Sequence, residues 1–171
     1  MQLFNKKRLY LAIYYSDPRT GHEDQKYRFG FIVGPKDESR RDHARGLSCR
    51  VRRLSSTAWQ YEETRLGDVR MADDLLARVL IAKVTDEERL MAILREAPVQ
   101  DDTNYGWCKD VVTRIANDDK AVGWPAIKKW ESIEAVSLAF VCSKRMDGRY
   151  PAHPGRPKPT WNALRRKEII H

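Results

Sequence analysis

The sequence predicts an α+β fold in which a small antiparallel sheet packs against about three helices. Two observations favour this class. Short apolar segments, separated by polar or turn-forming residues, follow one another up to residue 84, as is typical of strands. From residue 85 onward, apolar residues recur at intervals of three and four, as is typical of helices.

The first two predicted strands flank a turn-forming segment. Residues 8–15 are rich in Leu, Ile and Tyr and run into the sequence SDPRTG, which favours a loop. The second strand covers residues 27–33, and the sequence GPKD stops it. We expect the polar stretch at residues 37–46 to form a mobile surface loop.

Three further strands are predicted before the helical part of the chain. Residues 47–53 and 59–62 are short candidates. Residues 75–84 contain the sequence RVLIAKV, and this run of branched apolar residues indicates the most buried strand.

The first helix has a clear start. Residues 85–88, TDEE, have the form of a capping box with Thr85 as the cap, and Leu90, Ile93 and Leu94 are spaced for one helical face. Pro98 ends this element.

Two more helices and a proline-rich tail are predicted after Pro98. The second helix begins among the N-cap candidates at residues 101–104 and carries Trp107, Val111, Val112 and Ile115. The third helix runs from about Pro125 to Arg145, since proline is tolerated in a first turn. We expect residues 147–171 to be extended and irregular and to pack on the body through Trp161 and Leu164.

Length and composition describe one ordinary globular domain, residues 1–171. Charged residues make up 33% of the chain, and no apolar run approaches the roughly 20 residues that span a bilayer. The first eight residues, MQLFNKKR, lack the apolar stretch of a secretory signal. We therefore expect a cytoplasmic protein with no membrane span.

The charge and the cysteines narrow the classes of partner. The net charge of +8 comes from basic residues that are dispersed among acids, which favours a solvated surface over a nucleic-acid footprint. Cys49, Cys108 and Cys142 lack metal-ligand spacing, so we expect neither a metal nor a cofactor. The tryptophans outside the motifs described next, Trp59, Trp124, Trp130 and Trp161, are assigned to packing.

Two motifs carry the functional prediction: YRFGFIVGPK at residues 27–36 and TNYGWCKD at residues 103–110. Together with segments over nearly the whole chain, they resemble a family of small, mostly uncharacterised fungal proteins. Those proteins are similar to circularly permuted papain-like domains, the group that includes the lecithin-retinol acyltransferase relatives. The resemblance implies a permuted papain-like arrangement of the predicted sheet and helices.

The resemblance also implies that the catalytic residues are replaced. In the papain-like group a strand supplies a histidine, and a later helix begins with the nucleophilic cysteine. Arg28 stands where that histidine would be, and Arg50 takes the place of a second histidine. Asn104 falls at the nucleophile's position, or Tyr105 if the register slips by one. These residues supply neither a thiolate nor a base, but they can bind a carboxylate or polarise a carbonyl.

We therefore expect a non-hydrolytic small-molecule enzyme, a cyclase or isomerase of fungal specialised metabolism, acting on an apolar substrate that carries a carbonyl or carboxylate. The expected catalytic residues are Arg28, Arg50, Asn104 and Tyr105. The expected substrate-binding residues are Tyr14, Phe29, Trp107 and Cys108, because aromatic and apolar side chains around a polar corner are the usual form of a small-molecule site.

Two alternatives stay open at this point. Cys108 lies one helical turn after Asn104 and would act as a displaced nucleophile in a hydrolase or acyltransferase if it met one of the four histidines, His22, His43, His153 and His171. The other alternative is an inert binding or interaction protein. In that protein Arg28 and Arg50 form salt bridges with nearby acids, and Asn104 caps its helix.

Overall fold

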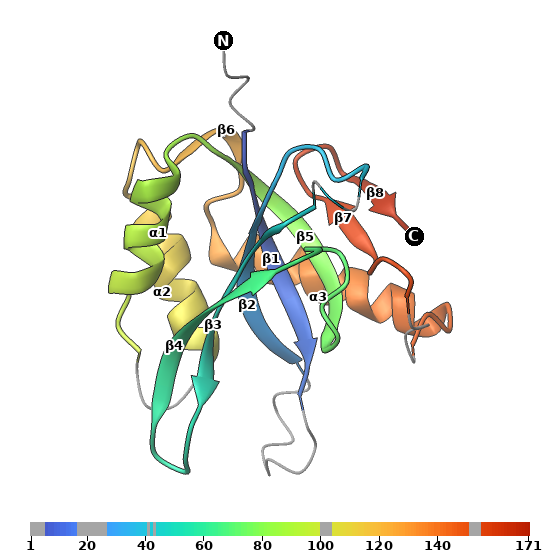
Figure 1. The fold of residues 1–171 in the computed structure, drawn as a ribbon, viewed down its shortest axis with the longest axis horizontal. Coiled ribbons are helices and arrows are strands. Elements are labelled where there is room, and N and C mark those ends of the chain that lie inside the picture. The colour runs from blue at the N-terminus through green and yellow to red at the C-terminus, as the bar shows by residue number, and fades with distance from the viewer. Residues whose placement is uncertain (1–5, 17–26, 41, 43, 100–103, 151–154) are drawn as a thin grey trace.

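A computed structural model describes residues 6–16, 27–40, 42, 44–99, 104–150 and 155–171 (Figure 1). The elements follow one another in the order β1 (Arg8–Tyr15), β2 (Tyr27–Gly34), β3 (Gly46–Arg53), β4 (Trp59–Leu66), β5 (Leu75–Val84), α1 (Glu87–Glu96), α2 (Asn104–Ala116), β6 (Val122–Ala126), α3 (Trp130–Met146), β7 (Thr160–Asn162) and β8 (Lys167–Ile170).

The strands of the described residues form one sheet in the order β4-β3-β2-β1-β5-β7-β8, and β6 also pairs with β5. Neighbouring strands are antiparallel except for β5 and β7, which are parallel. The predicted α+β class with three helices is thus confirmed, and the sheet is mixed because the chain crosses over between β5 and β7.

Alternation along the strands separates two apolar layers. Leu9, Leu11 and Ile13 of β1 belong to the larger core cluster, to which all three helices contribute. Tyr10 and Tyr14 point to the other face and belong to a smaller cluster without helical residues. Because side chains alternate along a strand, one face of the sheet is covered by helices and the other face is left for loops and polar groups (Figure 1).

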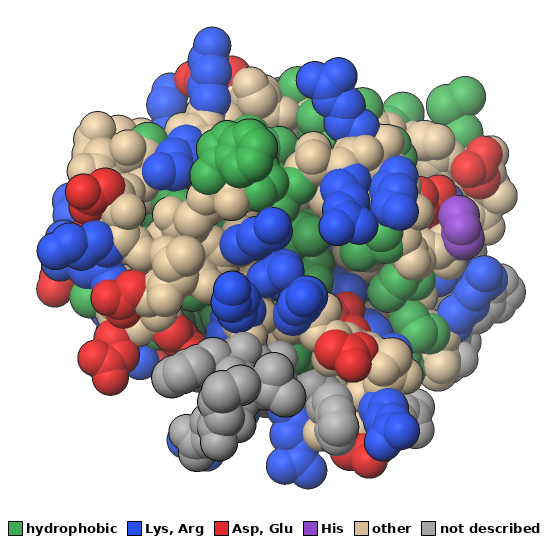
Figure 2. All heavy atoms as spheres, turned by 90° about the horizontal axis from the view of Figure 1, so that it is seen from above, with side chains coloured by type: hydrophobic (Ala, Val, Ile, Leu, Met, Phe, Trp, Pro, Cys, Tyr) green, Lys and Arg blue, Asp and Glu red, His purple; other side chains and the backbone are tan. Residues whose placement is uncertain are grey.

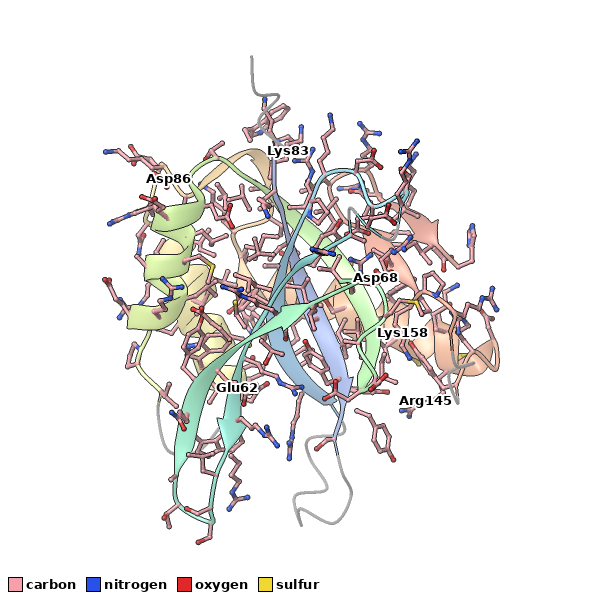
Figure 3. The ribbon with its side chains drawn as sticks, viewed as in Figure 1. Glu62, Asp68, Lys83, Asp86, Arg145 and Lys158 are labelled. Carbon is pink, nitrogen blue, oxygen red and sulfur yellow. The ribbon has the colours of Figure 1, made fainter. Side chains whose placement is uncertain are left out.

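The start of α1 differs from the predicted capping box by one residue. Asp86 is the N-cap, and its carboxylate accepts a hydrogen bond from the backbone nitrogen of Arg89 at 2.9 Å (Figure 3). The Thr85 hydroxyl instead donates to the carbonyl of Lys120 at 2.5 Å. Thr85 therefore ties the helix start to the segment before β6, and Asp86 satisfies the free N–H of the first turn.

The predicted start of the third helix is wrong. Val122–Ala126, which includes Pro125, forms β6 on the edge of β5, and α3 begins only at Trp130. Backbone pairing with β5 outweighs the local preference of this short segment. The assignment of Trp124 to packing is also wrong, because this side chain is 92% exposed.

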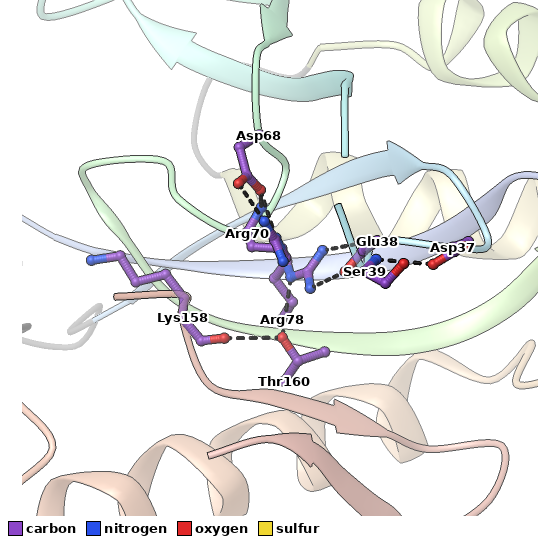
Figure 4. A network of polar contacts seen from close by, with 8 residues as sticks. All are labelled: Asp37, Glu38, Ser39, Asp68, Arg70, Arg78, Lys158 and Thr160. Atoms are coloured by element: carbon purple, nitrogen blue, oxygen red, sulfur yellow. Dashed lines mark hydrogen bonds and ion pairs between the residues drawn. The ribbon is translucent and has the colours of Figure 1, made fainter. Parts of the chain in front are cut away.

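The tail and the expected surface loop are also more ordered than predicted. Residues 160–162 and 167–170 form β7 and β8 instead of an irregular tail, and Trp161 packs against Phe140 with ring centroids 5.7 Å apart. In the expected mobile loop, Ala44 is buried and Glu38 forms an ion pair with Arg78 (Figure 4). Of that loop, residues 41 and 43 lie outside the described part of the chain.

Candidate functional site

The candidate site lies where β2 and β3 separate. The two strands pair only from Phe31 to Val33 of β2, so the part of β2 before Phe31 has no strand partner on that side. Asn104, the first residue of α2, fills this gap. Its side-chain oxygen accepts from the backbone nitrogen of Phe29 at 2.6 Å, and its side-chain nitrogen donates to the carbonyl of Phe29 at 2.5 Å.

Asn104 is therefore a buried tether between α2 and β2. Its amide makes the two hydrogen bonds that a neighbouring strand would have made with Phe29, so neither backbone group is left unsatisfied. Asn104 is only 3% exposed. The prediction placed its amide beside the substrate, whereas its oxygen and its nitrogen each make a hydrogen bond to the backbone of Phe29.

A polar pocket of about 190 Å³ opens beside this tether. Strands β1, β2 and β3 supply most of its walls, and the segment before β5 supplies Asp74. The residues that line it are Tyr14, Tyr15, Arg28, Phe29, Arg50, Val51, Arg52, Asp74 and Asn104. Five residues of the predicted site thus meet at one pocket: Arg28, Arg50, Asn104, Tyr14 and Phe29.

Arg50 is held in place from two sides. Its guanidinium donates to the Asp74 carboxylate at 2.6 Å and lies 4.9 Å from the centre of the Tyr14 ring. Burial opposes the charged form of Arg50, but the ion pair with Asp74 outweighs it, and the net effect raises the pKa of Arg50. The guanidinium stays cationic, with its orientation set by a carboxylate and an aromatic face.

The close approach of Arg50 to Tyr14 depends on Gly30. A Cβ added at Gly30 would lie 3.0 Å from the Cβ of Arg50 and 3.3 Å from the Tyr14 ring. Such contacts are tighter than most Cβ contacts in proteins, so a side chain at this position would require Arg50 or Tyr14 to shift by a few tenths of an ångström.

Tyr14 supplies an uncharged phenol. Its hydroxyl shares a 3.0 Å hydrogen bond with the Ser48 hydroxyl. Burial raises the pKa of Tyr14 to about 12, although Ser48 and Arg50 act in the opposite direction. At neutral pH the pocket therefore contains a neutral phenol below Arg50.

Arg28 differs from Arg50 because no ion pair joins it to another residue of the described part of the chain. It projects from β2 and is half-buried. Among the described residues, Arg52 makes only a long and exposed contact, with Glu62 at 3.5 Å. The pocket accordingly presents more positive than negative charge, which favours a ligand with a carboxylate or a polarised carbonyl.

Three predicted site residues lie elsewhere. Tyr105 donates from its hydroxyl to Glu134 at 3.0 Å and packs its ring edge-on against Trp130. Trp107 is buried in the core, where its ring lies 5.6 Å from that of Phe31. Cys108 is completely buried, and burial raises its pKa well above the ordinary thiol value.

Asp74 is the acidic residue of the pocket that sequence reasoning missed. It precedes β5, and its backbone carbonyl accepts a hydrogen bond from Tyr15 at 3.3 Å. The antiparallel pairing of β1 with β5 carries it to the pocket. No local pattern around Asp73 and Asp74 marks this position, because the pairing joins segments far apart in the sequence.

Comparison with known protein families matches one family model to residues 6–170, which include every strand and helix and every residue of the pocket. The chain belongs to a family of unknown function (DUF6914). No curated protein and no solved structure matches it. The described residues of this family member contain no helix long and apolar enough to cross a membrane.

Proposed function

We propose that this protein binds a small carboxylate- or carbonyl-bearing molecule in the polar pocket and isomerises it without forming a covalent intermediate. The observation that carries this proposal is the side-by-side placement of Arg28, which has no acidic partner among the described residues, and the Arg50–Asp74 pair. A cation that can bind an anionic group and a carboxylate that can accept a proton, here Asp74 with Arg50 already donating to it, make a minimal acid–base site.

The proposed reaction is a proton transfer next to a carbonyl. Arg28 binds the carbonyl oxygen, and the Asp74 carboxylate accepts a proton from the adjacent carbon. The electron pair of the broken C–H bond moves toward that oxygen, where Arg28 stabilises the developing negative charge. In a substrate with a carbon–carbon double bond next to that carbon, the electron pair also spreads to the far carbon of the double bond. Asp74 returns the proton to this far carbon, and the double bond moves into conjugation with the carbonyl. Arg50 orients Asp74 through the 2.6 Å contact and stays cationic throughout.

The volume of the pocket favours isomerisation over cyclisation. Pockets for drug-sized ligands have volumes of about 300–1,000 Å³, whereas this one has about 190 Å³. A long polyene would not fold inside it, so we propose a compact substrate.

The surroundings of Asn104 support the proposed papain-like relationship. The helix that would begin with the nucleophile and the strand that would carry the histidine are in direct contact, through the two hydrogen bonds between Asn104 and Phe29. A cysteine hydrolase fits less well. Cys108 is buried with a raised pKa, so little thiolate forms, and His171, the histidine among the described residues, is exposed and contacts Glu168. The other candidates, His22, His43 and His153, lie outside the described residues.

Binding without turnover is the second candidate. The observation that favours it is that Asn104 and Arg50 already have partners within the protein, Phe29 and Asp74. Such a protein would retain the ligand site and leave its ligand unchanged.

Hydrogen–deuterium exchange separates the two candidates. Pyruvate and 2-oxobutanoate would be incubated with the protein in D₂O, and proton NMR would follow both binding and the loss of the protons at C3. We expect the protein to accelerate this exchange. Asp74→Asn should abolish the acceleration, and Arg28→Met should weaken binding by about tenfold, the loss of one charge-assisted contact.

Arg114→Met is the matched control, because Arg114 lies on the exposed side of α2 and pairs with Asp110. It should change neither binding nor exchange. Binding that depends on Arg28 without accelerated exchange would identify a binding protein. If neither 2-oxo acid binds, or if Arg28→Met binds as tightly as the native protein, the pocket is not the site.

A further inference from the structure

A second hollow lies apart from the polar pocket, between α3 and the edge of the sheet that carries β6 and β7. It is an open groove of about 820 Å³. Its walls are mostly apolar, and the residues that line it are Pro125, Ala126, Ile127, Ser132, Val136, Ala139, Phe140, Ser143, Trp161, Ala163, Leu164 and Arg166. This volume is within the range of about 300–1,000 Å³ that is usual for small-molecule sites.

One face of α3 forms the helical wall of the groove. Ser132, Val136, Ala139 and Ser143 recur at intervals of four, three and four residues, which places them along a single stripe of the helix. Their side chains are small, so the helix leaves space between itself and the strands. Phe140 of the same helix also lines the groove, and its ring packs against Trp161 with centroids 5.7 Å apart.

On the side opposite α3, the two chain segments that line the groove are each followed in the sequence by exposed basic residues. Residues 125–127 are followed by Lys128 and Lys129, and residues 163–164 are followed by the basic run 165–167. All five basic side chains are exposed. The end of the molecule that carries β6 shows the same character, with an exposed hydrophobic side chain among Lys and Arg (Figure 2).

Acidic side chains near the groove are engaged with other partners. Glu131 pairs with Lys109, Glu134 accepts from Tyr105, and Glu168 pairs with Lys144. Within the described residues no carboxylate pairs with Arg166. Arg166 is also the one charged residue among those that line the groove.

The backbone at Arg166 supports a functional role for this residue. Its φ angle is +51°, in the left-handed region that residues with a side chain seldom adopt. A strained backbone of this kind persists where the surrounding structure holds it, often at a ligand site. Here it places a cationic side chain at an apolar groove.

We propose that the groove binds a free amphiphilic carboxylate of the fatty-acid type, with its aliphatic chain between α3 and β7 and its carboxylate at Arg166. The apolar walls take the chain, because burying methylene groups is favourable. The exposed cations select an anionic head group. This site is independent of the polar pocket and of the reaction proposed there.

The first test uses the native protein and three ligands of equal chain length, measured by isothermal titration calorimetry below their micelle concentrations. We expect dodecanoate to bind about fivefold more tightly than dodecanol, the effect of one exposed charge pair. Dodecyltrimethylammonium, with the opposite charge, should bind more weakly than either. Shortening dodecanoate to decanoate should weaken binding by up to about fourfold for each methylene removed.

Variants of α3 locate the site. Ala139→Phe fills the groove and should weaken dodecanoate binding by at least about tenfold. Ala135→Phe makes the same change one turn earlier on the same helix, at an exposed residue that does not line the groove, and should leave binding unchanged. Because Ala139 is also exposed, neither change requires the core to rearrange, and circular dichroism would check the fold.

Variants of the basic run test the head-group contact. Arg166→Asn should reduce the affinity for dodecanoate to that for dodecanol, and asparagine is suited to the positive φ angle at this position. Arg165→Asn, at the adjacent exposed residue, is the control and should have little effect.

Three results with the native protein would overturn the proposal. The first is that dodecanoate does not bind. The second is equal affinity for the anionic, neutral and cationic ligands. The third is binding to phosphatidylglycerol vesicles but not to free dodecanoate, because this would identify a membrane surface as the partner. Equal weakening by Ala139→Phe and Ala135→Phe would place the ligand outside the groove.

Discussion

Asn104 shows how one side chain can replace a missing strand. The part of β2 before Phe31 is not paired with β3. Without another partner, the backbone of Phe29 would be left with an unsatisfied buried donor and an unsatisfied buried acceptor. The Asn104 amide satisfies both. An asparagine is suited to this position because its side chain carries one acceptor and one donor group in the same plane.

We predict that Asn104→Ala lowers the free energy of unfolding by about 3 kcal/mol. The change leaves the N–H and the C=O of Phe29 without partners, and each unsatisfied buried group costs about 1–3 kcal/mol. Urea denaturation at neutral pH would measure the loss. Asn117→Ala, at an exposed position, is the control and should change stability by less than about 0.5 kcal/mol. A similar small change for Asn104→Ala would show that water replaces the tether.

Part of the candidate site could be predicted from the sequence because its residues lie in two short motifs. The motif at residues 27–36 carries Arg28 and Phe29, and the motif at residues 103–110 carries Asn104. The contact between these two motifs brings three residues of the candidate site together. The helical spacing predicted that Cys108 and Asn104 lie on the same side of the helix, and both are buried. That side faces the core, which helical spacing alone does not distinguish from a pocket.

At the scale of the elements, the segments that were predicted incorrectly are short and depend on distant partners. β7 has only three residues, and β6 has five. Both lie on the second edge of β5, β7 against Arg78–Leu80 and β6 against Ala82–Val84. Such strands are too short to show alternation, so their structure comes from pairing with β5 and not from their own sequence.

The turn between α2 and β6 depends on Asp118. Its carboxylate accepts hydrogen bonds from the backbone nitrogens of Ala121 and Lys120 at 2.8 and 2.9 Å and from Arg89 of α1 at 2.6 Å. These bonds, with that from Ala121 the strongest influence, lower the pKa of Asp118 to about 2. One ionised side chain thus holds the turn and joins it to the neighbouring helix.

We predict that Asp118 makes stability depend on pH in the acidic range. The folded state binds the Asp118 proton more weakly than the unfolded state, whose pKa is close to about 4. The stabilisation is therefore complete above about pH 4 and is lost as the pH falls toward 2. The difference in unfolding free energy between the native protein and Asp118→Asn should shrink over this range, as measured by urea denaturation at several pH values.

Asp119→Asn is the matched control, because Asp119 is the adjacent acid and is exposed. Its substitution should change the free energy of unfolding by less than about 0.5 kcal/mol. A difference between the native protein and Asp118→Asn that does not change with pH would mean that the turn does not depend on the ionised form of Asp118.

At the scale of the whole molecule, Arg78 joins segments from three parts of the chain. It lies on β5 with no exposed surface, forms two 2.8 Å hydrogen bonds with Glu38 after β2, and donates to the Thr160 hydroxyl of β7 at 3.2 Å (Figure 4). Its guanidinium also lies 4.5 Å from the centre of the Tyr10 ring. The face of the sheet without helices is therefore closed by a buried ion pair.

We predict that Glu38→Gln lowers the free energy of unfolding by about 3 kcal/mol, because it leaves the charge of Arg78 buried without a counterion. Urea denaturation would measure this loss. The double variant Arg78→Met/Glu38→Met removes both charges and should recover most of the stability, since apolar replacements of a buried pair are often neutral. Glu62→Gln is the control. Glu62 makes an exposed contact with Arg52 and accepts an exposed hydrogen bond from the Thr64 hydroxyl at 3.2 Å (Figure 3), so its loss should cost less than about 0.5 kcal/mol. If Glu38→Gln is as stable as this control, the pair does not hold the segment after β2 to the sheet, and the packing of Ala44 and its neighbours must do so instead.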